Sequence, residues 1–262
     1  MTVTSSGRER LSVADLDLEV VRQGAGRPLL LLHGFQTVAP DAPFLDLLGR
    51  HAEIIAPSHP GFGDSPRPAD FETVYDLVHL YLELLETLRH ETVSLMGLSF
   101  GGWLAAEIAV KAGARIDRLV LVDALGIKIS DPETPDILDV FNAHPREVVR
   151  ASWHAPKKWA PRYDDMPDDQ LVRVARARDA LCLYGWHPYM HNPRLRRWLG
   201  RIRRPALVVW GASDGVVKPS YGEAYSKLIP GSRFALIPGA GHHPEIEQPR
   251  AFADCVGAFL DE

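Results

Sequence analysis

The sequence predicts an α/β fold, with a mostly parallel sheet, helices on both faces of the sheet and an inserted helical cap. Short apolar runs typical of buried strands alternate with helical patterns, which is the order of a parallel sheet. Residues 126–204 interrupt this order, because no run within them is typical of a strand. We therefore expect residues 1–125 and 205–262 to form a core domain, and residues 126–204 to form a cap (lid) inserted between two strands.

The expected strands follow one another along the chain. Residues 10–13 and 16–22 alternate between apolar and polar side chains and flank Ala14-Asp15, which predicts an antiparallel hairpin. An apolar run typical of a strand buried on both faces comes later, at residues 28–32. Further strands are expected at residues 53–56, 92–96, 118–123, 205–210 and 233–237. The carboxyl ends of parallel strands meet at one edge of a sheet, so polar residues that follow these runs are candidates for a site.

The expected helices are of two groups. In the core, residues 73–89 place apolar side chains at helical spacing, and residues 102–110 are rich in alanine. In the cap, helical patterns cover residues 134–142, 145–153 and 171–186. The cap therefore has enough helix to cover the carboxyl ends of the strands.

Composition sets limits on location and partners. The chain has 262 residues with a net charge of −5, which does not suggest nucleic acid binding. No apolar run has the length of a membrane span, and Met1 to Arg10 lacks the apolar core of a signal peptide. Cys182 and Cys255 are expected to be buried, reduced thiols. We expect a cytoplasmic protein that acts on a small molecule, and the sequence leaves a homodimer open.

Charge is divided unevenly between the two parts. Residues 126–204 carry 15 Lys and Arg against 10 Asp and Glu, so the cap is basic and the core acidic. Six arginines crowd the return to the sheet: Arg194, Arg196, Arg197, Arg201, Arg203 and Arg204. Two interpretations stay open, a solvated basic face that docks on the acidic core and a cap that attracts anionic substrates.

The segment Gly97-Leu98-Ser99-Phe100-Gly101 reads G-x-S-x-G between an expected strand and an expected helix. A serine on such a turn is exposed above a parallel sheet and needs small neighbours. A serine hydroxyl is a poor nucleophile at neutral pH, so it needs a base and a third group that orients the base. Asp214 follows the strand 205–210 and His242 follows the strand 233–237, so both lie at the same sheet edge as Ser99.

These segments resemble the α/β-hydrolase superfamily over essentially the whole chain. The matching segments occur in the order Leu32–Phe35, Pro60–Ser65, Gly97–Gly102, Gly211–Asp214 and Gly239–His242. The resemblance implies the superfamily's α/β-hydrolase sheet and a serine hydrolase with a Ser-Asp-His triad. No cofactor and no metal are expected.

The resemblance also implies a role for each matching residue. Ser99 is the expected nucleophile, His242 the base and Asp214 the acid. The oxyanion hole is expected to use the backbone N–H groups of Phe35 and Phe100.

Other residues compete for these roles. His243 is a second candidate for the base, and Asp123, at another strand end, is a second candidate for the acid. His33 is expected to be structural, and His59 and Asp64 are expected to stabilise a turn.

A serine nucleophile predicts acyl transfer rather than the alkyl-enzyme chemistry of relatives with an aspartate there. We expect hydrolysis of a small carboxylic ester or lactone through an acyl-enzyme, the activity of a carboxylesterase or lactonase. A second hypothesis is hydrolysis of a C–C bond in an acidic dienoate or β-diketone-like substrate. Relatives that cleave C–C bonds typically carry Trp after the base, where this chain has His243. A third hypothesis is a non-catalytic ligand receptor on the same fold.

The cap is rich in aromatic residues and is expected to determine the substrate. Such side chains either line an apolar pocket or form the cap's own core. We expect Trp186 and Tyr189 to contact substrate.

Overall fold

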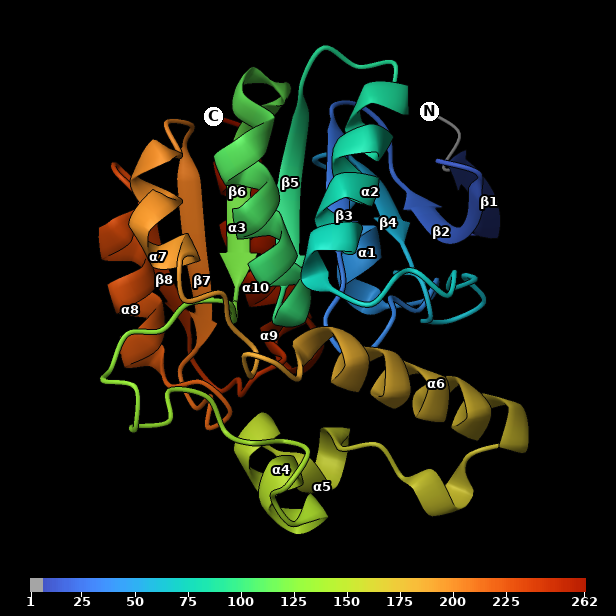
Figure 1. The fold of residues 1–262 in the computed structure, drawn as a ribbon, viewed down its shortest axis with the longest axis vertical. Helices are drawn as coiled ribbons and strands as arrows, with labels where there is room; N and C mark the ends of the chain where they lie inside the picture. Colours follow the sequence, from blue (N-terminus) through green and yellow to red (C-terminus); the bar gives the residue numbers. More distant parts are fainter. Residues whose placement is uncertain (1–6) are drawn as a thin grey trace.

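An eight-stranded sheet forms the centre of the protein, whose computed structural model describes residues 7–262 (Figure 1). Its strands are β1 (Gly7–Val13), β2 (Leu16–Gln23), β3 (Pro28–Leu32), β4 (Glu53–Pro57), β5 (Val93–Leu98), β6 (Ile116–Val122), β7 (Ala206–Gly211) and β8 (Arg233–Ile237). Their order is β1-β2-β4-β3-β5-β6-β7-β8, and only the β1/β2 and β2/β4 pairs are antiparallel. The predicted mostly parallel α/β fold is confirmed. Part of the expected polar N-terminus, residues 1–6, lies outside the described residues.

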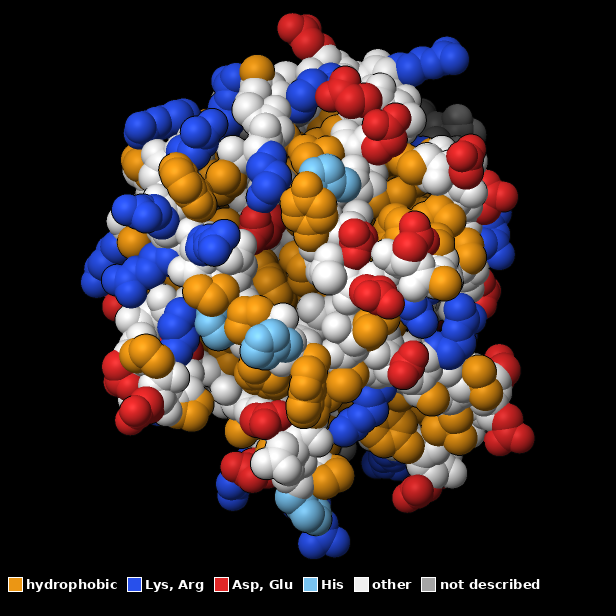
Figure 2. Space-filling view, viewed as in Figure 1, with side chains coloured by type: hydrophobic (Ala, Val, Ile, Leu, Met, Phe, Trp, Pro, Cys, Tyr) orange, Lys and Arg blue, Asp and Glu red, His pale blue; other side chains and the backbone are white. Residues whose placement is uncertain are grey.

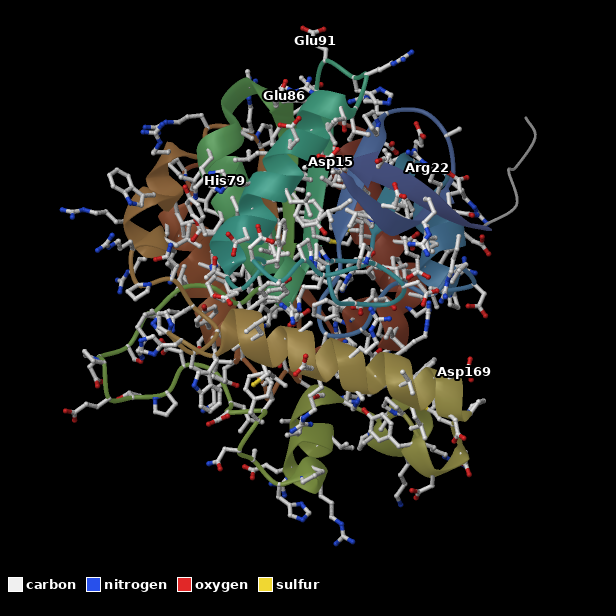
Figure 3. All side chains as sticks on the ribbon, turned by 45° about the vertical axis from the view of Figure 1, so that its right-hand side comes forward. Asp15, Arg22, His79, Glu86, Glu91 and Asp169 are labelled. Carbon is white, nitrogen blue, oxygen red and sulfur yellow. The ribbon has the colours of Figure 1, made fainter. Side chains whose placement is uncertain are left out.

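The β1/β2 hairpin closes through the predicted two-residue turn. Val13 pairs with Leu16, and Ala14 and Asp15 have φ values of 48° and 61°. Positive φ at both central residues is the geometry of a type I′ turn, whose twist matches that of the flanking strands. Asp15 lies on this turn, in front of the sheet (Figure 3).

Helices cover both faces of the sheet. One face carries α2 (Val74–Thr87), α3 (Phe100–Ala112) and α8 (Pro219–Leu228), and the other carries α1 (Pro43–Leu48) and α10 (Pro249–Leu260) (Figure 1). Strand β3 shows why its sequence has no alternation. Leu30 and Leu32 point into the first core, and Leu29 and Leu31 point into the second, so all four are fully buried.

The chain between β6 and β7 is helical. It contains α4 (Pro145–Ser152), α5 (Pro156–Trp159), α6 (Asp168–Gly185) and α7 (Leu195–Trp198), with 3₁₀ turns at Tyr163–Asp165 and Leu199–Arg201. Helix α6 crosses the carboxyl ends of the strands, with Asp169 near its outer end (Figures 1 and 3). The division of the chain into a core and a cap at residues 126 and 204 stays a prediction.

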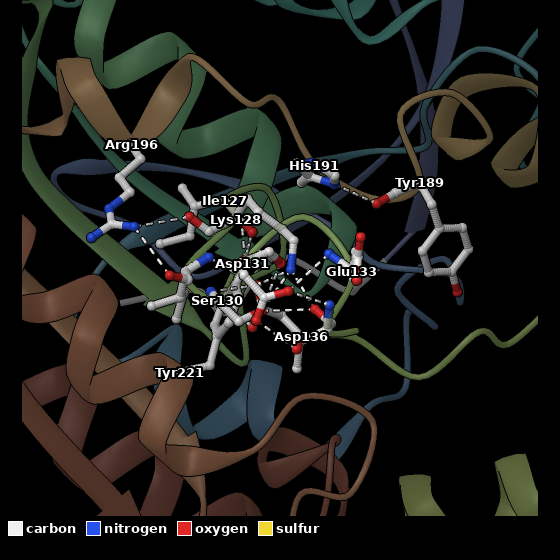
Figure 4. Close-up of polar contacts among 12 residues, drawn as sticks. Ile127, Lys128, Ser130, Asp131, Glu133, Asp136, Tyr189, His191, Arg196 and Tyr221 are labelled. Carbon is white, nitrogen blue, oxygen red and sulfur yellow. Dashed lines mark hydrogen bonds and ion pairs between the residues drawn. The ribbon is translucent and has the colours of Figure 1, made fainter.

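The two ends of this insertion lie side by side (Figure 4). The N–H of Gly126 donates to Met190 O at 3.1 Å, and its carbonyl accepts the N–H of Asn192 at 2.9 Å. The Arg196 guanidinium donates to Ile129 O at 3.1 Å. Asp136 accepts the N–H of Ile129 at 2.8 Å. The first and last parts of the insertion are therefore hydrogen-bonded to each other where the chain leaves and rejoins the core.

Ion pairs hold helix α6 against the core. Arg173 contacts Glu19 at 2.8 Å and Asp64 at 2.7 Å. Tyr184 Oη donates to Pro60 O at 3.2 Å. Arg173 thus joins a cap helix to two acidic side chains of the core, as the first of the two charge interpretations requires.

The crowded arginines of the return segment, residues 194–204, lie at the surface. All six are exposed. Figure 2 shows basic side chains gathered on the side of the molecule where α7 lies. Their positions favour a solvated face.

The expected helix at residues 134–142 is wrong. Its backbone donors bond to other partners: Leu138 N–H to Val216 O at 2.8 Å and Val140 N–H to Tyr189 Oη at 2.8 Å. Asp139 accepts the N–H of Phe141 at 3.1 Å, which makes a local turn. Aspartate side chains that compete for backbone donors favour turns over helices.

Two further expectations can be compared with the structure. Cys182 and Cys255 are free, but both are half-buried rather than buried. Within residues 7–262, no helix combines the length and the apolar character needed to cross a membrane. The cytoplasmic location stays a prediction.

Helix α3 lies very close to β3 and β5 because glycines face these strands. A Cβ on Gly101 would lie 2.1 Å from Leu32 O, and a Cβ on Gly97 would lie 2.2 Å from Gly101 O. Contacts this short do not occur between real atoms, so these positions exclude every side chain. The small residues of the G-x-S-x-G segment are therefore explained by packing.

We expect Gly101→Ala to lower the free energy of unfolding by about 1–3 kcal/mol, because the added methyl forces α3 away from β3. Urea unfolding followed by circular dichroism measures this loss. Gly200→Ala is the matched control, since nothing lies within 4 Å of its added methyl, and it should change stability by less than about 0.5 kcal/mol. Equal stability of the two variants would contradict the packing argument.

Candidate active site

Ser99 occupies the sharp turn between β5 and α3. Its φ is 51° and its ψ is −113°, a conformation that non-glycine residues rarely adopt. The Ser99 N–H donates to Val122 O at 2.8 Å, and Ser99 O accepts the N–H of Leu125 at 3.1 Å. The end of β6 therefore fixes the strained backbone on both sides. Strain of this kind is maintained where the surroundings hold a functional side chain in place.

Ser99, His242 and Asp214 form a hydrogen-bonded chain across three loops. The Ser99 hydroxyl lies 2.7 Å from His242 Nε2, and His242 Nδ1–H donates to Asp214 Oδ2 at 2.7 Å. The second oxygen of Asp214 accepts the N–H groups of Val216 at 2.8 Å and Val217 at 3.1 Å. The structure thus brings together the three residues that the sequence proposed as nucleophile, base and acid.

The surroundings of His242 adjust its basicity. Burial lowers the pKa of the imidazole, but the charge and hydrogen bond of Asp214 and the charge of Glu245 outweigh burial and raise the pKa above 6.5. An imidazole of this kind takes a proton readily from a hydroxyl and is held in one orientation by its acid partner.

The expected oxyanion-hole residues lie on either side of Ser99. Phe100 is the first residue of α3, and the first N–H groups of a helix have no partner within the helix. Phe35 lies on the loop after β3, whose backbone passes so close that a Cβ on Gly34 would lie 3.0 Å from Ser99 Cβ. The role of these two N–H groups stays a prediction.

A pair of buried histidines supports the loop that carries Phe35. His33 Nδ1–H donates to Gly34 O at 2.7 Å, and His33 Nε2 accepts the N–H of His59 at 2.9 Å. His59 Nε2–H donates to His33 O at 2.9 Å and His59 Nδ1 accepts the Tyr81 hydroxyl. All ring nitrogens have partners, as expected for a structural pair. Asp64 instead pairs with Arg173 of the cap.

The competing candidates lie beside the chain rather than in it. His243 stacks on Trp153 with ring centroids 4.5 Å apart and pairs with Glu245 at 3.5 Å. Asp123 accepts the N–H of Gly211 at 2.9 Å through Oδ1, while His242 bonds to Asp214. Among the described residues, Asp123, Asp214 and His242 are the one set that brings three metal-ligand atoms together. Because His242 bonds to both Asp214 and Ser99, this set fits a hydrogen-bonded chain better than a metal site.

Glu247 is a structural residue of the site whose role the sequence did not reveal. Its carboxylate accepts three backbone N–H groups, from Gly241 at 2.6 Å, His154 at 3.0 Å and Ala155 at 2.9 Å. It lies at the end of the short helix α9 (Pro244–Glu247) and is buried. The three donors come from segments that no local sequence pattern places beside Glu247.

The cap segment also bonds directly to the loops of the site. His242 N–H donates to Ser152 O at 2.8 Å, and Gly215 N–H donates to Ala151 O at 2.9 Å. The end of α4 therefore contacts the loop of the histidine and the loop of the aspartate.

A cavity of about 400 Å³ lies between the cap and the Ser99 loop. Its wall is mostly apolar, with side chains that include Ile137, Phe141, Val174, Leu181 and Met190. Ser99 and His242 contribute its polar end. Among the described residues that line it, Arg178 is the one Lys or Arg.

Only one of the two expected cap residues lines this cavity. Tyr189 does, and its hydroxyl donates to Leu138 O at 2.7 Å. Trp186 does not: it is 60 % exposed, and its ring centroid lies 6.1 Å from that of Phe141. It directly follows the last residue of α6. Tyr163 takes a place in the wall that the sequence did not assign.

A smaller compartment of about 110 Å³ lies on the other side of Ser99. The loop of Gly34 to Ala42 and the segment from His242 to Ile246 form its walls. Ser99 and His242 line both compartments, so a carbonyl carbon held at Ser99 has room for a group on each side.

Comparison with known proteins identifies the class. The sequence pattern of the Alpha/beta hydrolase family matches residues 29–255. The chain belongs to this family and is an α/β hydrolase.

Several relatives are similar along the chain. A 2-hydroxy-6-oxo-2,4-heptadienoate hydrolase of Pseudomonas putida is 27 % identical, and the match covers 90 % of each chain. The polyketide synthase ThaQ of Burkholderia thailandensis is 31 % identical over 93 % of this chain, which spans only 12 % of that protein's length. A meta-cleavage product hydrolase of Pseudomonas fluorescens IP01 has a similar structure, with a TM-score of 0.79, 21 % identity and 98 % coverage of both chains.

The buried histidine pair predicts a loss of stability in acid. Burial, opposed by the hydrogen bond to Gly34, lowers the pKa of His33 from 6.5 to about 4. Between these values the unfolded chain binds a proton that the folded one does not, so the free energy of unfolding falls as pH falls from 6.5 to about 4. The His33 share of this loss is up to about 3 kcal/mol.

Urea unfolding at pH 7 and pH 4.5 measures this effect. We expect His33→Gln, which keeps a donor and an acceptor, to lose less stability between the two pH values than the wild-type protein. The exposed His187→Gln is the control and should behave as the wild type. A His33→Gln variant with the full wild-type loss would contradict the assignment.

Proposed function

We propose that this α/β hydrolase cleaves a C–C bond beside a ketone in a small, acidic, dienoate-like substrate. The arrangement of the site supports this proposal, since Ser99 and His242 line a largely apolar cavity whose wall includes one arginine, Arg178. The names of the similar hydrolases point to the same substrate class. An ester or lactone hydrolase, which the sequence favoured, becomes the second candidate.

In the proposed reaction Ser99 is the nucleophile, His242 the base and Asp214 the acid that orients it. The Ser99 Oγ bonds to the ketone carbon while His242 Nε2 takes the hydroxyl proton. The N–H groups of Phe35 and Phe100 are proposed to stabilise the oxyanion. The order of events is that of other serine hydrolases up to this point.

The C–C bond breaks next, and its electron pair goes to the carbon of the leaving half. The bond is cleaved in the keto tautomer of the dienoate, in which the carbon beside the ketone is saturated, so conjugation with the neighbouring enone spreads this negative charge and makes carbon an acceptable leaving atom. The imidazolium of His242 returns its proton to the leaving half. Water then attacks the acyl-Ser99 ester with His242 as the base and releases a carboxylic acid, so one water is consumed per bond broken.

The main support for an acidic substrate is the presence of Arg178 among the residues that line the cavity. A substrate that is largely apolar and bears one carboxylate matches a largely apolar wall that includes Arg178, whose side chain is partly exposed at the surface. A charge-assisted hydrogen bond to a carboxylate is stronger than a neutral one, and arginine forms it in a fixed geometry. Tyr163, which lines the same wall, lies near Arg178.

One residue favours the second candidate. His243 stands where C–C-cleaving relatives typically carry Trp, and it lines both compartments beside Ser99. Ester and lactone hydrolysis use the same nucleophile, base and oxyanion hole, because only the leaving atom differs. A receptor that binds such a ligand without turnover is the third candidate.

Purified protein tested on an oxo-dienoate, on short esters and on lactones separates the three candidates. We expect loss of the dienoate absorbance with formation of two acids, and we expect Ser99→Ala to lower kcat by at least about 1000-fold. A fluorophosphonate probe should label the wild-type protein and not Ser99→Ala. Ester turnover without dienoate turnover would promote the second candidate, and tight binding with negligible turnover would promote the receptor.

We expect Arg178→Met to raise KM for the acidic dienoate about 10- to 100-fold with a smaller change in kcat, because a charge-assisted hydrogen bond to the carboxylate is lost. Steady-state kinetics measures both constants. Arg197→Met, at an exposed cap arginine outside the cavity, is the matched control and should leave KM unchanged. Equal KM values for the Arg178→Met and wild-type proteins would show that Arg178 does not bind the carboxylate.

A further inference from the structure

The carboxyl group of Asp123 is buried at the site, and the proposed reaction gives it no role. Asp123 is the first residue after β6 and is 1 % exposed. Its φ is 43°, so the backbone is strained here as it is at Ser99. Oδ1 accepts the N–H of Gly211 at 2.9 Å, while Oδ2 is buried and has no partner among the described residues.

Asp123 lies directly beside the acid and the base. One carboxylate oxygen of Asp123, one of Asp214 and one ring nitrogen of His242 lie within 4.8 Å of one another. The charged groups that face Asp123 are Asp214 on the loop after β7, His242 on the loop after β8 and Glu245 on α9. Glu245 in turn pairs with His243 at 3.5 Å.

Two adjacent buried carboxyl groups cannot both carry a charge at low cost. The hydrogen bonds of the two carboxyl groups differ, and a carboxylate that accepts more N–H groups is the better place for the negative charge. Asp214 accepts three N–H groups, from His242, Val216 and Val217, and Asp123 accepts one. Burial and the charge of Asp214 raise the pKa of Asp123 well above its usual value. The proton therefore belongs on Asp123.

We propose that Asp123 is a positioning residue, which keeps its proton and donates it to the carboxylate of Asp214. This inference rests on the proposed roles of Ser99, His242 and Asp214. The hydrogen bond uses the otherwise unpartnered Oδ2 of Asp123. It holds the Asp214 carboxylate against His242 Nδ1 and withdraws part of its negative charge from the imidazole.

As a consequence, Asp214 stabilises the protonated form of His242 less strongly. A neutral donor beside Asp214 keeps the pKa of His242 lower than the full charge of an unassisted carboxylate would make it. His242 then stays unprotonated, and able to act as a base, at lower pH. The acid limb of the kcat/KM profile reports this protonation in the free enzyme.

Two substitutions of Asp123 test the proposal through that limb. Asp123→Asn keeps a neutral N–H donor, so the limb should stay where it is in the wild type. Asp123→Ala removes the donor, so the limb should move to higher pH by about 0.5–1 unit, the equivalent of one neutral hydrogen bond. A shift of both variants to lower pH would show that Asp123 is ionised, and no shift in either would show a merely structural residue. Either result overturns the proposal.

Two spectroscopic measurements need no turnover and so separate this proposal from the proposed function. Infrared spectra of the wild-type protein should contain the C=O band of a protonated carboxylic acid, and spectra of Asp123→Asn should lack it. A band that is present in both proteins, or absent from both, overturns the proposal. Proton NMR of the His242 ring N–H, assigned with His242→Gln, should titrate as the kinetic limb does. An enzyme without C–C hydrolysis but with these signatures would refute the proposed reaction and leave Asp123 in its role.

Discussion

The close approach of helix α3 to strand β3 is the constraint on which the site depends. Gly97 and Gly101 permit it, because neither position has room for a Cβ. The approach forces Ser99 into a positive φ and turns its hydroxyl out over the sheet edge. From there it meets His242, which arrives from the far end of the sheet. Without this packing, the residues at the other strand ends would have no common partner.

The sequence predicted the parts of the structure that follow from local patterns. The apolar runs marked buried strands because a parallel sheet covered on both faces leaves no polar side chain in a strand such as β3. Ser99, Asp214 and His242 were found because each lies on the turn or loop after a strand, and the topology then brings them together. Their spacing in the sequence carried the information about the site.

The remaining features depend on contacts between distant segments. Residues 134–142 have helical spacing, but their donors bond to Val216 and Tyr189, which no local pattern reveals. Trp186 lies one residue beyond the end of α6, and that single position turns it toward solvent. Glu247 accepts three backbone N–H groups from two other segments, which no local pattern places beside it. For residues 134–142 and for Glu247, contacts with distant segments decide the outcome, and the local sequence does not show those contacts.

Glu247 has a consequence for how proteins of this kind diversify. Its carboxylate joins the amides of the cap linker, at His154 and Ala155, to the amide of Gly241, next to His242. A cap exchanged for that of another hydrolase would therefore disturb the imidazole unless the new linker presented amides at the same points. Recombination between family members should succeed when the crossover carries the linker and the last histidine loop together, and this joint inheritance is a design rule for chimeric enzymes.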